Sequence, residues 1–312
     1  MCFLSLKLNN HYYMDIIQDI RTPDQFKTTT FSKYQKSSVK KEWMNSMIKA
    51  NVESSCYWTT ELICSGLFSD LWELILLFYA KYIHCGNPKI PAYLDMRFET
   101  FKKEVATTEE LHLRNRLIIR QIFVEMVCIL SKSPRKHSYD SIDIGKDTSI
   151  VKSRLIAPTI EFNKAFHSTD PKELFIPLNE FGYTLHTKNC VSACYWIEWI
   201  LLFLSKNKCV AVERDFCSKC KTDGIWLVWA TLLAYAPTPI AKKIMESLIH
   251  LFSMAYTPSV KEKRKYLLYY AVSLCCEPIH METDLIQDKK IIEIAYDKCW
   301  LMYKDIRKHE IS

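Results

Sequence analysis

The sequence predicts an all-α protein in which two helical units of similar plan pack together behind a short N-terminal extension. Three observations lead to this prediction. Only five of the 312 residues are glycine, whereas sheets and phosphate-binding turns depend on glycine. Apolar residues recur at helical spacing along most of the chain. One short motif also occurs twice, which is typical of a duplicated unit.

The repeated motif starts at an asparagine and ends at a tryptophan. Residues 51–58 read Asn-Val-Glu-Ser-Ser-Cys-Tyr-Trp, and residues 189–196 read Asn-Cys-Val-Ser-Ala-Cys-Tyr-Trp. We interpret its last three positions as structural, because small cysteines let helices approach while tyrosine and tryptophan fill the remaining space. These positions are Cys56, Tyr57, Trp58, Cys194, Tyr195 and Trp196. Equivalent burial of Trp58 and Trp196 is therefore expected.

Periodicity and composition divide the chain into four parts. We expect an arm rich in basic and aromatic residues at 1–41, a helical unit at 42–130, a linker at 131–157 and a second helical unit at 158–312. The second unit carries a cysteine-containing insert at 205–223. The insert is inferred because the motif's tryptophan lies 14 residues before Trp72 in the first copy and 30 residues before Trp226, the tryptophan that we align with Trp72, in the second. Such insertions fall in loops.

The net charge of +7 permits an anionic partner without requiring one. Lysines interleaved with aromatic residues in the arm fit either a surface that binds single-stranded nucleic acid or a solvated arm whose aromatic residues pack on the core. The candidate nucleic-acid contacts, from the arm and two later clusters, are Lys33, Lys36, Lys40, Lys41, Arg135, Lys136, Lys263, Arg264 and Lys265. We expect any such binding to be weak and independent of sequence.

Thirteen cysteines, mostly scattered through apolar runs, suggest reduced thiols and an intracellular protein. The first residues lack the features of a signal peptide, and no apolar stretch approaches the roughly 20 residues that a bilayer requires. We therefore expect an intracellular protein that does not insert into membranes.

The insert holds the best candidates for a metal site. Cys217 and Cys220 form a C-x2-C pair that fits two corners of a tetrahedral zinc site, and Cys209 would be a third ligand. No second pair follows at zinc-finger spacing, so the alternative of surface thiols without metal is favoured. Phosphate-binding loops, dinucleotide fingerprints and hydrolase motifs are absent from the sequence. We therefore expect no cofactor and no catalytic residues.

Short patches of the chain resemble uncharacterised proteins of large DNA viruses that infect algae and protists, the mimivirus and phycodnavirus group. The patches are Cys194-Tyr-Trp-Ile-Glu-Trp199, Asp223-Gly-Ile-Trp226-Leu-Val-Trp229 with the basic insert before it, and Ser55-Cys56-Tyr57-Trp58. The resemblance implies a viral protein that acts inside the infected cell.

The leading hypothesis is a non-enzymatic interaction or scaffold protein in viral replication, transcription or assembly. The alternative is a protein that binds nucleic acid irrespective of sequence. A metal-dependent enzyme ranks third.

Overall fold

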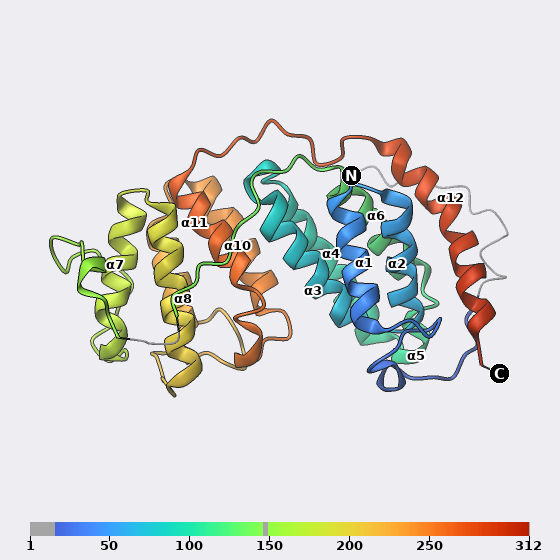
Figure 1. Cartoon of the computed structure of the whole chain (residues 1–312), viewed down its shortest axis with the longest axis horizontal. Coiled ribbons are helices and arrows are strands. Elements are labelled where there is room, and N and C mark those ends of the chain that lie inside the picture. The colour runs from blue at the N-terminus through green and yellow to red at the C-terminus, as the bar shows by residue number, and fades with distance from the viewer. Residues whose placement is uncertain (1–15, 146–148, 312) are drawn as a thin grey trace. The chain divides into compact units, whose positions relative to one another are not determined.

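A computed structural model describes residues 16–145 and 149–311, and every regular element in these residues is a helix (Figure 1). The predicted all-α fold is therefore confirmed. The first 15 residues of the predicted arm lie outside the described part of the chain.

The helices belong to two compact units, each assembled from separate segments. The first comprises the chain up to residue 75, residues 97–133 and the residues from 286 onward, and the second comprises residues 76–96 and 134–285. The units predicted from sequence were continuous segments, whereas these units are not. The predicted domain boundaries and the duplication of whole units therefore stay predictions.

Helix α2 is the centre of the first unit and packs against α1, α6 and α12 (Figure 1). The helices of this unit are α1 (Lys36–Ile48), α2 (Val52–Cys64), α5 (Glu110–Leu113), α6 (Leu117–Lys132) and α12 (Lys289–Ile306), together with most of α3 (Phe68–Phe78) and α4 (Ile90–Thr107). Short 3-10 turns, η2 (Pro23–Phe26) and η8 (Arg307–His309), flank this set.

In the second unit, helix α8 packs against α7, α9 and α11. The main helices here are α7 (Phe175–His186), α8 (Cys190–Lys206), α9 (Ile225–Ala234), α10 (Pro239–Ser253) and α11 (Lys265–Cys276). A π-helical turn, η3 (Tyr79–Ile83), and a 3-10 turn, η4 (His84–Gly86), belong to the same unit, as do η5 (Lys152–Arg154), η6 (Lys172–Leu174) and η7 (Pro258–Val260).

Both copies of the motif begin a helix in the same way. The residue before each asparagine has a positive φ, 52° at Ala50 and 57° at Lys188. The asparagine amide then donates back to the preceding helix, at 3.0 Å for Asn51 and 2.8 Å for Asn189, which is the Schellman arrangement. Each asparagine side chain also accepts from the amide three residues later, at 3.1 Å in both copies. The local geometry of the motif is therefore repeated.

The expectation that Trp58 and Trp196 are equally buried is wrong. Trp196 is 1% exposed and packs with its edge toward Trp199, whereas Trp58 is only half-buried. Tyr34, which contacts Trp58 with ring centroids 5.6 Å apart, is itself exposed to solvent.

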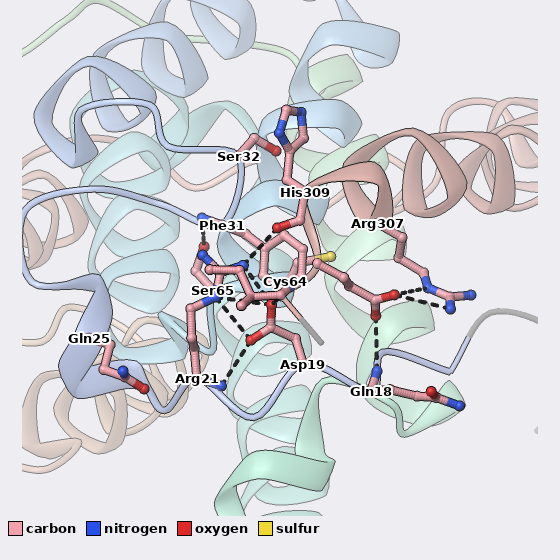
Figure 2. A network of polar contacts seen from close by, with 12 residues as sticks. Gln18, Asp19, Arg21, Gln25, Phe31, Ser32, Cys64, Ser65, Arg307 and His309 are labelled. Carbon is pink, nitrogen blue, oxygen red and sulfur yellow. Dashed lines mark hydrogen bonds and ion pairs between the residues drawn. The ribbon is translucent and has the colours of Figure 1, made fainter.

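A buried carboxylate joins the two ends of the first unit. Asp19 accepts hydrogen bonds from the Arg21 guanidinium and, at 2.9 Å, from the Ile311 amide beyond α12 (Figure 2). Arg21 also donates to the carbonyl of His309 at 2.9 Å, and Arg114 donates to the carbonyls of Asp19 and Cys64. Burial raises the pKa of Asp19, but the hydrogen bonds from Arg21 and Ile311 outweigh it and hold the pKa below its usual value.

Because only one of the two motif tryptophans is fully buried, their replacement should have unequal costs. We expect Trp196→Ala to lower the free energy of unfolding by about 3 to 5 kcal/mol, and Trp58→Ala to lower it by clearly less. Urea unfolding followed by far-ultraviolet circular dichroism would measure both. Equal losses would contradict the difference in packing.

Candidate functional site

The predicted nucleic-acid contacts are distributed over both units, and most have partners within the protein. In the first unit, Lys36 and Lys40 both pair with Asp70, at 3.0 and 2.7 Å. Lys33 and Lys41 are exposed. Two of the four lysines of this cluster therefore form ion pairs with Asp70 of the protein itself.

The clusters of the second unit are also engaged internally. Lys136 lies 3.6 Å from Glu277, and Lys265 pairs with Glu198 at 2.7 Å. Arg264 is buried and donates to two backbone carbonyls, while the Arg135 guanidinium lies 5.2 Å from the centre of the Phe78 ring. Lys263 is exposed. These pairs reduce the positive charge available to a phosphate backbone, and binding of nucleic acid stays a prediction.

The cysteines of the insert, Cys209, Cys217 and Cys220, are half-buried. Within the residues that the structure describes, no three His, Cys, Asp or Glu side chains are placed to hold a metal ion. Burial raises the pKa of Cys209 and of Cys220, which disfavours the thiolate form that zinc requires.

The insert is held to the unit by a buried ion pair. Asp170 accepts from the Arg214 guanidinium at 2.8 and 3.1 Å and from the amides of Val212 and His167, both at 2.8 Å. Burial alone would raise the pKa of Asp170. The hydrogen bonds and the charge of Arg214 lower it by more, so the pKa lies below its usual value. The insert is therefore an anchored loop.

An apolar groove of about 340 Å³ lies in the first unit between the start of α2 and helix α12. Val52, Ile291, Ile294 and Met302 supply its apolar wall, and the buried Cys56 of the motif forms its floor. The motif thus contributes to a surface feature as well as to the core.

Three buried thiols, Cys56 of α2, Cys128 of α6 and Cys299 of α12, lie behind this groove. The neighbouring thiols of Cys128 and Cys299, together with burial, raise the pKa of Cys56, so it stays a neutral thiol. The Arg120 guanidinium also lies 3.9 Å from the centre of the Tyr303 ring of α12. Helix α12 is therefore packed onto α2 and α6 by specific contacts.

The second unit contains another polar cluster, which sequence reasoning missed. His84 follows the π-helical turn with φ of 32° and is fully buried. Its Nε2 lies 2.8 Å from the carbonyl oxygen of His137, and its Nδ1 lies 3.4 Å from the hydroxyl of Tyr139. Burial lowers the pKa of His84 to about 4, so the ring is neutral. Nε2 then carries the proton and donates to His137, while Nδ1 accepts from Tyr139.

The cluster continues from Tyr139 to the second copy of the motif. The Tyr139 hydroxyl lies 2.5 Å from Ser273 Oγ, which lies 3.7 Å from Cys190 Sγ. No sequence pattern joins these residues, because Tyr139 lies in the predicted linker and Ser273 lies in an ordinary apolar helix.

Comparison with known proteins finds no matching family model, curated protein or solved structure. Among the described helices, none has the length and apolar character needed to cross a bilayer.

The depressed pKa of Asp170 makes stability dependent on pH. Because the carboxyl has a lower pKa in the folded protein than in the unfolded chain, its stabilising effect is complete above the unfolded value of about 3.9 and is lost as pH falls through the folded value. We expect Asp170→Asn to cost about 3 kcal/mol at neutral pH and to reduce the loss of stability on acidification. Asp140→Asn, at an exposed position, is the matched control. Urea titrations at several pH values would measure both effects, and similar curves for the two variants would contradict the account.

Proposed function

We propose that this protein is a non-enzymatic interaction protein and that the groove between α2 and α12 binds an acidic amphipathic helix of a partner protein. The observation that carries the proposal is the apolar strip along α12. Ile294, which lines the groove, is 53% exposed, and Leu301 is 51% exposed. They are seven residues apart, two helical turns, and so lie on the same side of α12. Exposed apolar surface that continues a groove is typical of a protein-binding site.

The shape of the groove suits a helix. Its apolar wall runs along α12 from Ile291 to Met302, a length of about three turns. An amphipathic helix presents apolar residues at spacings of three, four and seven, which match the spacing of the side chains on α12. A partner helix could therefore cover Ile294 and Leu301 while one of its own apolar side chains enters the groove.

Charge around the groove favours an acidic partner. Lys132 and Lys298 line it, and exposed Lys290 lies one turn before Ile294. Glu53 also lines the groove and pairs with Lys298 at 3.0 Å. Both side chains of this pair are exposed to solvent. Such exposed pairs contribute about 1 kcal/mol or less, so Lys298 can exchange Glu53 for a partner's carboxylate. The N-terminus of α2, which also lines the groove, adds partial positive charge.

The setting we propose is viral replication, transcription or assembly. This part of the proposal rests on the resemblance of the two motif copies and the second tryptophan patch to proteins of large DNA viruses.

The test is capture of partners from the cells in which the protein is made, followed by direct measurement. Wild type, Ile294→Glu/Leu301→Glu and the control Ile160→Glu, changed at an exposed position of the second unit, would each be used as bait. A partner held by wild type and control but not by the double variant would be purified. Its affinity would then be measured by titration calorimetry with the full-length protein. We expect the double variant to bind at least about tenfold more weakly, a loss of about 1.4 kcal/mol.

Two results would contradict the proposal. One is a partner that binds the double variant and wild type with equal affinity. The other is absence of a selective partner together with tight binding of oligonucleotides that persists at about 200 mM salt, which would favour nucleic acid instead.

A further inference from the structure

We propose that one face of α7 is a binding site for an extended segment of a partner protein, and that residues 155–163 of the chain itself occupy this site in the structure. We call residues 155–163 the strap, and the face of α7 that carries Asn179, Glu180 and Gly182 the cradle. Both belong to the second unit, so the site is separate from the groove of the first unit.

Glu180 binds the backbone of the strap. Its buried carboxylate accepts from the amide of Ile156 at 3.0 Å and from the amide of Ala157 at 3.1 and 3.2 Å. Within the described residues, no lysine, arginine or histidine forms an ion pair with Glu180. A buried carboxylate is costly unless donors surround it. A cradle without the strap would therefore require amide donors from another source.

Asn179 also recognises backbone groups. Its buried side chain accepts from the amide of Phe162 at 3.1 Å and donates to the carbonyl of Thr159 at 2.8 Å. Every residue except proline offers both a backbone donor and a backbone acceptor. The contacts of Asn179 and Glu180 therefore select an extended backbone and place few demands on the side chains of the segment.

The cradle has one position that selects a side chain. The Phe162 carbonyl accepts from the Tyr235 hydroxyl at 2.7 Å, and a Cβ atom at Gly182 would lie 2.2 Å from the same carbonyl oxygen. Glycine is needed where a backbone approaches so closely. The Phe162 ring packs against Tyr183 and His186, with ring centroids 4.9 and 5.4 Å apart. The ligand class is therefore an extended segment with an aromatic residue at this position.

The strap is suited to exchange because it buries few of its own side chains. Leu155, Ile156 and Ile160 are exposed, and the strap, which the structure describes in full, contains no helix. Segments with little apolar burial open locally at a small cost in free energy. Since the strap is tethered to the cradle, its effective concentration is on the order of millimolar. The strap thus keeps the cradle closed until a partner that binds more strongly replaces it.

The test is binding of a fluorescent peptide to the full-length protein, measured by anisotropy. The probe has the sequence of residues 152–164. Ala157→Pro removes from the strap an amide that donates to Glu180. We expect this opened variant to bind the probe at least about tenfold more tightly than wild type does, because the tethered competitor is weakened.

The matched control is Lys152→Pro. Lys152 begins the 3-10 turn η5, where proline is tolerated because no amide is needed, and Val151 before it is already extended. This variant should bind the probe as weakly as wild type does.

Two further changes locate the probe on the protein. Gly182→Ala, added to Ala157→Pro, puts a Cβ atom where the Phe162 carbonyl must lie, so binding should return to the wild-type level. A probe that carries Ala157→Pro and Phe162→Ala should bind the opened variant at least about tenfold more weakly, because it lacks an amide and the aromatic ring.

Thermal melting would verify that each variant is folded. Should Ala157→Pro not fold, Phe162→Ala provides a second opened variant that keeps every amide of the strap. Should neither fold, hydrogen exchange of the strap in wild type decides the question. Excess probe should then speed exchange of residues 155–163, and an unchanged rate would overturn the proposal.

Three other results would overturn it. One is equal binding of the probe to wild type and to a folded opened variant, or absence of binding to both. Another is binding that persists after Gly182→Ala, which would place the probe elsewhere. The third is a stable dimer of the opened variant in light scattering, formed by exchange of the strap, because the ligand of the cradle would then be a second copy of this chain.

Discussion

The carboxylate of Asp19 is the interaction on which the first unit depends most. Its side chain is fully buried and receives hydrogen bonds from Arg21 and from the Ile311 amide, residues from opposite ends of the chain. Because a buried carboxylate is costly unless it is paired, these partners must stay in place for the unit to remain folded. This requirement fixes the segment before α1 and the segment after α12 together, and it thereby holds α12 at the edge of the unit.

The position of α12 in turn creates the proposed binding surface. Its inner face packs on α2 and α6, where Cys299 and Tyr303 are buried and Arg120 contacts the Tyr303 ring. Its outer face keeps Ile294 and Leu301 exposed. Helix α12 therefore has apolar residues on two sides, and only those on the inner side are buried by other parts of the chain. That imbalance is the physical basis of the proposed interaction.

The same local motif is used differently in the two units. Both copies begin a helix with an asparagine cap after a left-handed residue, and both place a cysteine in the second turn. In α2 the position after the asparagine is Val52, which lines the apolar groove. In α8 it is Cys190, whose sulfur lies 3.7 Å from the Ser273 hydroxyl. The position after the asparagine therefore contacts different surroundings in the two copies.

Sequence patterns were sufficient for the helical class, because it follows from short-range periodicity. They were insufficient where distant segments meet. The pairing of Lys36 and Lys40 with Asp70 cannot be read from a basic cluster, and the half-burial of Trp58 depends on whether Tyr34 covers it. The contact of Tyr139 with Ser273 spans 134 residues. Periodicity describes one element at a time and contains no information on such contacts.

Hydrogen exchange of α12, measured by mass spectrometry on the full-length protein, tests the central claim most directly. The account predicts that α12 amides are protected in the wild type, and that Asp19→Asn removes this protection while α8 in the other unit keeps its own. Asp24→Asn, at an exposed carboxylate of the same segment, should leave both helices unchanged. Rapid exchange of α12 in the wild type, or equal protection in wild type and Asp19→Asn, would contradict the account.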